Sequence, residues 1–218
     1  MTGQVLGHYR VLEQIGTGGM GEVYRARDER LGRDVALKLV HPSSAKDHDR
    51  LRRFELEARS AASLNHPNIV AVYDIGFHEE MPFIVTELLE GETLRERLAA
   101  GMLSVREVSD YSLQIIAGLM AAHEKHIVHR DPKPENLFIT KDYQIKILDF
   151  GIATLIHPEA IGAPSIQEMT TQTKMGSVLG TVAYMSPEQL RAKPVDARSD
   201  IFSLGANVPR KWGNSRPR

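Results

Sequence analysis

The chain has 218 residues, a formal net charge of −1, ordinary apolar content and no cysteine. This length fits one large domain or a two-lobed unit with a sizeable core. The lack of cysteine excludes structural disulfides and thiolate metal sites, and the near-neutral charge gives no reason to expect nucleic acid or an anionic membrane as a partner.

Neither the start of the chain nor its most apolar stretch predicts export or membrane insertion. Residues 1–4 lack the basic and apolar regions of a signal peptide. Residues 115–122 are too few to span a bilayer, which takes about 20 apolar residues in a helix. We therefore expect a cytoplasmic protein with no membrane segment in this chain.

The first part of the chain reads as strands with one helix. β-Prone patterns predict strands at residues 9–16, 21–28, 34–40, 69–78 and 82–87. A helix is predicted within residues 46–64, where Phe54, Ala58 and Ala61 recur at helical spacing. Five strands and one helix make a small lobe.

After residue 88 the pattern becomes mainly helical. Thr93 with Glu96, and Ser104 with Glu107, each fit a capping box, in which a hydroxyl and a carboxylate satisfy N–H groups at a helix start. The second box opens a helix whose predicted buried face consists of Val105, Val108, Ser112, Ile115, Leu119 and Ala122. The last predicted elements are strands at residues 137–140 and 144–148 and a long mobile loop at 156–180.

A glycine-rich turn joins the first two predicted strands. Its spacing, Gly16-Thr17-Gly18-Gly19-Met20-Gly21, also occurs in dinucleotide-binding loops, but those loops open a helix, whereas residues 22–26 are β-prone. A strand–turn–strand of this kind lets backbone N–H groups approach phosphates closely. The alternative is a plain glycine-rich hairpin.

Three further motifs follow the glycine turn. Lys38 lies on a predicted strand, where an inward-facing lysine is costly unless it meets an anion such as an ATP phosphate; a solvated edge-strand lysine is the alternative. The run His129-Arg130-Asp131-Pro132-Lys133-Pro134-Glu135-Asn136 precedes Asp149-Phe150-Gly151. A glycine loop, a strand lysine, an aspartate with its asparagine and a second aspartate come in the order that phosphoryl transfer from ATP needs.

On these motifs the chain resembles the catalytic domain of bacterial-type, eukaryotic-like serine/threonine protein kinases, truncated in its C-terminal lobe. The resemblance implies an α+β, two-lobed protein-kinase-like fold. Residues 1–88 would form a small antiparallel β lobe with one helix, residues 89–206 an incomplete, mainly helical large lobe, and residues 207–218 a basic, disordered tail.

The resemblance implies transfer of the ATP γ-phosphate to serine or threonine hydroxyls of proteins, with ATP and Mg²⁺ as cofactors. Asp131 would orient the substrate hydroxyl, Lys133 would steady the transferring phosphate and Lys38 would hold the ATP phosphates. Asn136 and Asp149 would bind magnesium. The alternative is a truncated, non-catalytic kinase fragment that binds nucleotide or partners, or has no activity.

The implied nucleotide site is a set of residues from both lobes. It consists of Ile15, Gly16, Thr17, Gly18, Gly19, Met20, Gly21, Glu22, Val23, Ala36, Lys38, Glu57, Thr86, Glu87, Leu89 and Phe138. Apolar members would enclose the adenine, with Thr86 as gatekeeper and with Glu87 and Leu89 at the hinge. Glu57 would hold Lys38, with Glu55 as its rival. The apolar members are also ordinary core residues, so core packing is the alternative.

Other positions bear on specificity and control. Lys133 and Thr181 favour serine or threonine substrates over tyrosine. Control by an activation loop would act through phosphate paired with Arg130, and the candidate positions are Thr170, Thr171, Thr173 and Ser177. Pro132 replaces the leucine usual after the catalytic aspartate and pushes Asp131 towards extended backbone.

Three histidines, His123, His126 and His129, recur every third residue and raise the alternative of a zinc site. The first two are one residue short of the i, i+4 spacing that zincins use on one helix face. We expect instead that His126 ends the helix where glycine is common, and that His129 packs inside the catalytic loop.

Towards the end of the chain, residues 200–205 match the start of the family's central large-lobe helix, which Pro209 would stop. In the family Glu188 pairs with an arginine further along, and here no partner is evident. We expect missing helices to leave the face of the helix at residues 104–125 uncovered.

Overall fold

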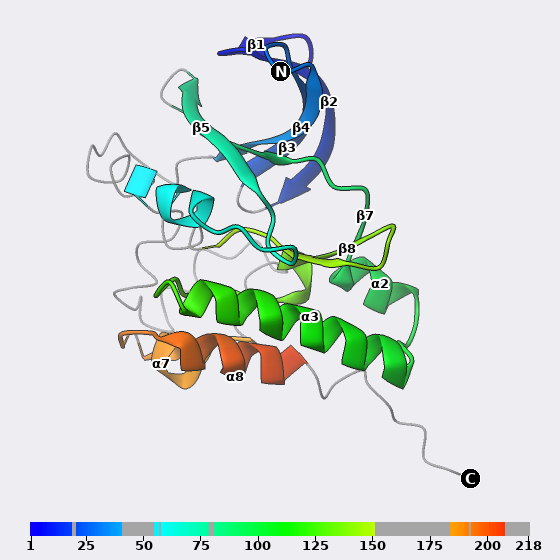
Figure 1. Ribbon diagram of the computed structural model, residues 1–218, viewed down its shortest axis with the longest axis vertical. Coiled ribbons are helices and arrows are strands. Elements are labelled where there is room, and N and C mark those ends of the chain that lie inside the picture. The colour runs from blue at the N-terminus through cyan, green and yellow to red at the C-terminus, as the bar shows by residue number, and fades with distance from the viewer. Residues whose placement is uncertain are drawn as a thin grey trace, which may run out of the picture.

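The computed structural model describes residues 1–18, 21–40, 55–56, 58–78, 81–150, 184–191 and 193–207. These residues form two lobes, with a curved sheet in one and with helices α3 and α8 side by side in the other (Figure 1). The elements are β1 (Val5–Leu6), β2 (Tyr9–Gly18), β3 (Gly21–Asp28), β4 (Arg33–Val40), β5 (Val72–His78), β6 (Met81–Glu87), β7 (Gly91–Thr93), α2 (Leu94–Ala100), α3 (Val105–His123), the 3₁₀ helix η1 (Pro134–Asn136), β8 (Leu137–Thr140), β9 (Ile145–Ile147), α7 (Pro187–Leu190) and α8 (Ala197–Asn207). The predicted two-lobed α+β architecture is confirmed.

The small lobe is built on one antiparallel sheet with the strand order β1-β2-β3-β4-β6-β5. All five predicted strands form, within three residues of their predicted ends. The count of five is wrong by one, because β1 pairs with β2 although its two residues are too short for a sequence pattern. Residues 55–56 and 58–62 are helical and belong to the predicted helix.

Alternation along the central strands gives this lobe its core. Tyr24 and Ala26 of β3 pair with Leu37 and Val35 of β4, and all four side chains are buried. Successive side chains of a strand point to opposite faces, so these four share one face of the sheet. The opposite face carries charged residues, including Lys38 of β4. Its sequence neighbours Leu37 and Leu39 point to the other face and are buried in the core.

Both predicted capping boxes are present and start α2 and α3. The side chains of Thr93 and Ser104 accept hydrogen bonds from the N–H groups of Glu96 and Glu107, whose carboxylates in turn accept from the cap N–H groups at 2.7 Å. A capping box depends on four consecutive residues, which is why sequence alone locates it.

The predicted buried face of α3 is confirmed at Ile115, Leu119 and Ala122 but is wrong at Val105, which is 83% exposed. Helical side chains tilt towards the helix N-terminus, so a residue of the first turn points beyond the core. Tyr111 and Gly118 complete the buried face instead.

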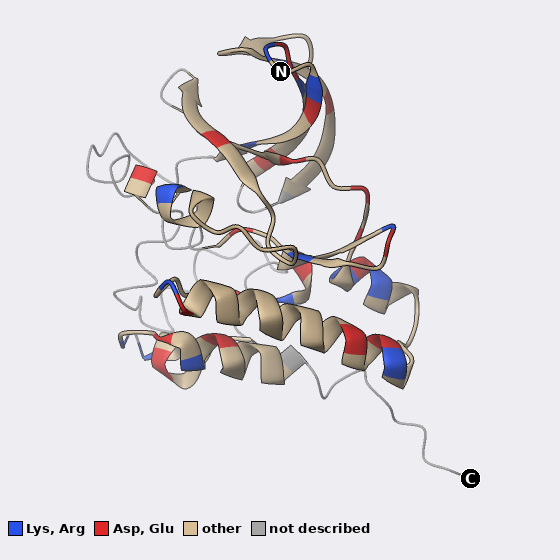
Figure 2. Ribbon diagram, in the orientation of Figure 1, with Lys and Arg blue, Asp and Glu red and all other residues tan. Residues whose placement is uncertain are grey.

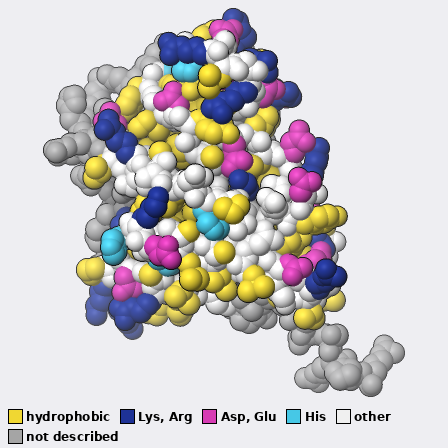
Figure 3. All heavy atoms as spheres, in the orientation of Figure 1, with side chains coloured by type: hydrophobic (Ala, Val, Ile, Leu, Met, Phe, Trp, Pro, Cys, Tyr) yellow, Lys and Arg dark blue, Asp and Glu magenta, His cyan; other side chains and the backbone are white. Residues whose placement is uncertain are grey.

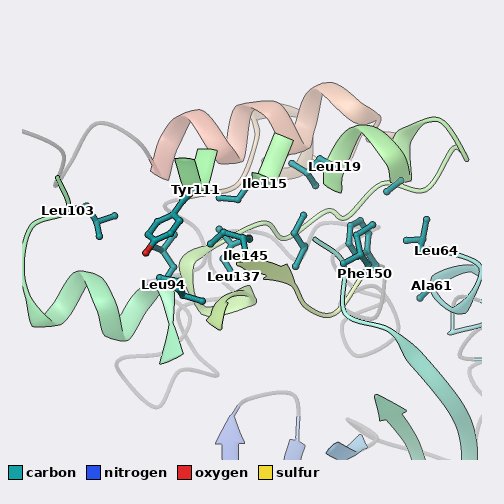
Figure 4. Close-up of a cluster of buried hydrophobic side chains, with 14 residues drawn as sticks. Ala61, Leu64, Leu94, Leu103, Tyr111, Ile115, Leu119, Leu137, Ile145 and Phe150 are labelled. Carbon is teal, nitrogen blue, oxygen red and sulfur yellow. The ribbon is translucent and has the colours of Figure 1, made fainter. Parts of the chain in front are cut away.

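A cluster of buried side chains fills the space between α3 and the three-stranded sheet β7-β8-β9 (Figure 4). Ile115 and Leu119 contribute from the helix, and Leu137 and Ile145 from the strands. The same cluster includes Ala61, Leu64 and Ile69, which precede β5 in the chain. The core of the large lobe is therefore completed by residues that come before it in sequence.

Residues 68–70 are bonded directly to the large lobe. Ile69 forms a parallel bridge with Ile147, and the Asn68 side-chain amide donates to the carbonyl of Ile145 at 3.0 Å. Glycine at position 118 permits this close approach, because an added Cβ would lie 2.7 Å from Ile147 Cδ1 and 3.2 Å from the carbonyl oxygen of Asn68, so that these neighbours would have to move.

Helices α7 and α8 follow a long stretch that includes the predicted mobile loop, which lies outside the described residues. Helix α8 begins at Ala197, three residues before the family match, and Asn207 still belongs to it. The rest of the predicted tail, residues 208–218, also lies outside the described residues.

The face of α3 predicted to be uncovered is in fact packed on the core. Apart from Val105, the exposed large apolar residues of these helices lie elsewhere, at Leu113, Ile116 and Met120 of α3 and at Ile201 and Phe202 of α8. Hydrophobic side chains gather in the lower part of the face shown in Figure 3, over these two helices. The sequence pattern thus located the core face correctly and assigned the exposure to the wrong side.

Basic and acidic residues are interspersed over both lobes (Figure 2). On the face of β3 and β4 that also carries Lys38, for example, Asp34 accepts hydrogen bonds from both Arg25 and Arg27. Within the described ranges no helix combines the length and apolar character that a bilayer crossing requires.

We expect Gly91→Ala to lower the free energy of unfolding by about 2 kcal/mol or more, because overlap and backbone strain add. Gly91 has a φ of +150°, and a Cβ there would overlap the carbonyl oxygen of Ile139. Gly101→Ala is the matched control, since Gly101 has a φ of +154° but no atom within 4 Å of an added Cβ. Urea denaturation compares the two variants. Equal losses would contradict the steric explanation.

The stabilising effect of the Glu107 cap should depend on pH. Hydrogen bonds from the N–H and hydroxyl of Ser104, and then from Arg97, lower the pKa of Glu107 from 4.5 to about 2. A carboxyl whose pKa falls on folding stabilises the protein above its unfolded pKa, and this effect is lost as the pH falls through about 2. Glu107→Gln should therefore destabilise the protein at pH 6 and progressively less towards pH 2. Urea denaturation at several pH values tests this, and a pH-independent difference would contradict it.

Candidate active site

A cavity of about 170 Å³ is lined by residues of both lobes. All seven residues predicted to surround the base line it, namely Ile15, Val23, Ala36, Thr86, Glu87, Leu89 and Phe138. Sequence reasoning missed seven others, which are Ala61, Ile69, Val70, Val72, Ile84, Leu148 and Phe150. These are apolar residues from separate segments, and no local pattern distinguishes them from core residues. The structure therefore brings the predicted base-binding set together, and its binding role stays a prediction.

The glycine turn closes β2 onto β3 beside this cavity. Thr17 pairs with Glu22 and Gly18 with Gly21, so the motif is a strand–turn–strand and does not open a helix. Gly21 has a φ of +134°, and a Cβ there would overlap the carbonyl oxygen of Leu39 in β4. The close backbone approach thus requires glycine at this position. Gly19 and Met20 lie outside the described residues.

Lys38 faces the cavity from the middle of the sheet. Its cross-strand neighbours are Val23 and Ile84, so it is not on an edge strand, and the predicted inward orientation is confirmed. Lys38 Nζ lies 2.6 Å from Asp149 Oδ2, and the two side chains are only 15% and 20% exposed. Glu57, its predicted partner, lies outside the described residues. The two charges predicted to bind ATP phosphates and magnesium neutralise each other here.

Asp131, Lys133 and Asn136 form a second polar cluster. Lys133 Nζ lies 2.6 Å from Asp131 Oδ2, and the Asn136 amide nitrogen donates to the same oxygen at 3.2 Å and to the Asp131 carbonyl at 2.9 Å. Pro132 is buried within this loop and does not prevent these contacts. Because the amide nitrogen of Asn136 faces Asp131, its amide oxygen points to the other side of the group.

The two clusters are adjacent because of Leu148. Its N–H donates to the carbonyl of Asn136 at 2.9 Å, and the next residue in the chain is Asp149. Asp149 has a φ of 57°, a left-handed conformation that turns its side chain away from the line of β9. The two predicted magnesium ligands therefore lie on neighbouring backbone segments.

His129 is fully buried, as predicted, and holds the loop at residues 129–136 through both ring nitrogens. Nδ1 accepts the N–H of Asp131 at 3.2 Å, and Nε2 lies 2.7 Å from the carbonyl oxygen of Leu148. An acceptor at Nδ1 and a donor at Nε2 require the neutral ring with its proton on Nε2. The ring of Phe150 packs edge-on against the His129 ring, with 4.7 Å between the two ring centroids.

The other two histidines have structural positions. His126 has a φ of 59°, so the prediction that it occupies a glycine-like helix end is confirmed. His123 donates from Nε2 to Asp200 Oδ2 at 2.7 Å. No group of three or more candidate metal ligands occurs among the residues that the structure describes.

Asp200 of α8 is completely buried and joins the loop at residues 129–136 to helices α3 and α8. Its Oδ2 accepts the N–H of His129 at 2.8 Å as well as His123, and its Oδ1 accepts the N–H of Arg130 at 2.7 Å. Sequence reasoning treated this residue only as part of a helix. Nothing local reveals its role, because its partners lie about 70 positions earlier.

Helix α7 also contacts this loop. The Gln189 side chain donates to the carbonyl of Arg130, whose φ is 72°. Glu188, for which no partner was expected, accepts a hydrogen bond from the Ser199 hydroxyl, which lowers the pKa of Glu188. That expectation was wrong because Ser199, in the first turn of α8, lies within hydrogen-bonding distance of Glu188 on α7. Thr181 and the candidate phosphorylation positions lie outside the described residues.

An inter-lobe cavity with a lysine–aspartate pair and an adjacent aspartate–lysine–asparagine cluster defines a protein-kinase type of fold and site. A family model described as "Protein kinase domain" matches residues 9–210, and the chain belongs to this family. Protein kinases generally use ATP and Mg²⁺. The predicted resemblance and fold are thereby confirmed.

Relatives and solved structures agree with this family. The chain is 43% identical over 203 residues to the serine/threonine-protein kinase PrkC of Bacillus subtilis, covering 93% of this chain and 30% of that protein. It is 45% identical over 201 residues to PknL of Mycobacterium tuberculosis, covering 92% and 48%. The kinase domain of M. tuberculosis PknI matches with a TM-score of 0.74 and 28% identity, over 95% of this chain and 73% of that one. The chain thus spans less than half the length of these two curated relatives.

We expect Asp200→Asn to destabilise the protein by about 2–3 kcal/mol, because the amide nitrogen cannot accept the N–H that one carboxylate oxygen now accepts. Asp196→Asn is the matched control, since Asp196 is exposed and caps the start of α8, where asparagine is almost equally good. Chemical denaturation measures both variants. A loss for Asp200→Asn no larger than that of the control would contradict the role assigned to Asp200.

Proposed function

We propose that the chain transfers the γ-phosphate of ATP to serine or threonine hydroxyls of proteins. The observation that carries the proposal is the adjacency of the Lys38–Asp149 pair and the Asp131–Lys133–Asn136 cluster beside one apolar cavity. An apolar cavity suits a base, an ammonium group suits phosphate, and a carboxylate next to a lysine suits a hydroxyl and the phosphoryl group it attacks.

In this proposal each charged group has a separate task. The Asp131 carboxylate accepts the hydrogen bond of the substrate hydroxyl and orients it, while Lys133 stabilises charge on the transferring group. Lys38 binds the non-transferred phosphates. The Lys38–Asp149 contact supports this, because both side chains already reach one point at the cavity wall.

The donor set fits magnesium. Asp149 offers a carboxylate and Asn136 an amide oxygen, the hard oxygen ligands that Mg²⁺ prefers. Asn136 bonds to Asp131 through its amide nitrogen, which supports a role for its amide oxygen as the ligand. When bound, Mg²⁺ would neutralise charge on the ATP phosphates.

Two features support serine or threonine as acceptors. Lys133 stands two residues after Asp131, as the resemblance requires, and PrkC and PknL are both named serine/threonine-protein kinases. Control by phosphate in the activation loop is part of the proposal. Arg130 would receive that phosphate, and the Gln189 contact to its carbonyl would transmit order to α7.

We expect three substitutions to separate binding from transfer. Asp131→Asn should lower kcat by about 10²–10⁴-fold while leaving the ATP dissociation constant within about twofold, because Asp131 acts on the hydroxyl. Lys38→Met and Asp149→Asn should weaken ATP binding and abolish detectable transfer, because they contact phosphate directly or through the metal. Radiolabelled phosphate transfer to casein and calorimetric titration with Mg-ATP measure both quantities.

Asp142→Asn is the control for these variants, since Asp142 is exposed in the turn between β8 and β9. It should behave like the unsubstituted chain. Transfer by Asp131→Asn at the control rate would disprove the assignment of that residue. A chain that binds Mg-ATP but transfers no phosphate would favour the non-catalytic alternative.

A further inference from the structure

Glu87 is held at the cavity wall by hydrogen bonds to Ala71 and Lys146. Its N–H donates to the carbonyl of Ala71 at 3.0 Å, and its Oε1 accepts the N–H of Ala71 at 2.9 Å. The same oxygen lies 2.7 Å from Lys146 Nζ. The backbone and the side chain of the first hinge residue are therefore both fixed, and only the lysine brings a charge.

Lys146 belongs to the other lobe. It lies on β9 directly opposite Phe138 of β8, which lines the same cavity as Glu87. The side chains of Lys146 and Glu87 are 15% and 22% exposed, so water screens the pair little. Removing one partner from such a shielded pair leaves the other charge uncompensated. The Lys146–Glu87 pair thus connects Glu87, on one side of the cavity, to the strands β8 and β9 that carry Phe138 on the other.

A second ion pair joins the same two segments in a different setting. Lys141 Nζ lies 2.6 Å from Glu90 Oε2, but these side chains are 72% and 69% exposed, and neither residue lines the cavity. Exposed pairs contribute little to stability because solvent screens them. The chain therefore contains its own matched control for the Lys146–Glu87 pair.

We infer that Lys146 is a positioning residue for the nucleotide base. It acts through Glu87, whose carboxylate it holds. It thereby keeps residues 87–89, the hinge, in the orientation in which they bind the base. This inference rests on the proposed function, because it takes the cavity as the nucleotide site. Lys38 and Asp149 hold the phosphates independently, so loss of Lys146 should act on recognition of the base alone.

The test compares ATP with adenosine, which has the base but no phosphate. Dissociation constants are measured by calorimetry for the 218-residue chain and for Lys146→Met, Lys146→Arg, Lys141→Met and Lys38→Met. Lys146→Met should weaken both ligands about five- to tenfold, the size expected for one charge-assisted hydrogen bond. Lys146→Arg should restore binding to within about twofold, and Lys141→Met should change nothing.

Lys38→Met distinguishes the two sites, because it should weaken ATP and leave adenosine binding unchanged. In transfer assays Lys146→Met should raise KM for ATP by the same five- to tenfold and change kcat less than twofold. A general loss of structure would lower kcat as well, and arginine would not restore it. Melting curves establish that each variant is folded at the assay temperature.

Should Lys146→Met fail to fold, Glu87→Gln removes the same ion pair from the other side with little change in volume. It should cause the same loss, and the double variant should lose no more than either single one. Equal affinities for Lys146→Met and Lys141→Met, or a loss for ATP without a loss for adenosine, would overturn the inference alone. An unsubstituted chain that binds neither ligand would overturn the proposed function and this inference together.

Discussion

The buried carboxylate of Asp200 is the constraint on which the rest of the site depends. A charge with no exposure to water is stable only where several donors converge on it, and here the N–H groups of His129 and Arg130 and the ring of His123 do so. Those bonds fix the loop that carries Asp131. They also fix α8 against the end of α3, so this loop and the two helices that support it form one unit.

Leu148 connects this anchored loop to the cavity. The carbonyl of Leu148 accepts a hydrogen bond from the ring of His129, and the N–H of Leu148 donates to the carbonyl of Asn136. The single residue between β9 and Asp149 thus sets the position of one predicted metal ligand relative to the other. Lys38 then reaches Asp149 from the small lobe, and the site closes across both lobes.

Features set by neighbouring residues could be predicted from the sequence, and features set by distant partners could not. The capping boxes at Ser104 and Thr93 were found because four consecutive residues define them. The inward orientation of Lys38 followed from the cost of burying a charge, yet its contact with Asp149 lies 111 positions away. The role of Asp200 could not be predicted for the same reason, because its partners His129 and Arg130 are distant in sequence. Val105 was misplaced because periodicity alone does not tell where along a helix the core begins.

The packing of Ala61, Leu64 and Ile69 into the large lobe has a consequence for how the chain folds. A ribosome delivers these residues well before α3 and β9, which contribute to the same buried cluster. The native cluster that buries them therefore cannot be complete until at least residue 147 has emerged, and closing this loop adds to the entropic cost of the transition state. The two lobes are separate in shape, but the core of the large lobe includes Ala61, Leu64 and Ile69 and is incomplete without them.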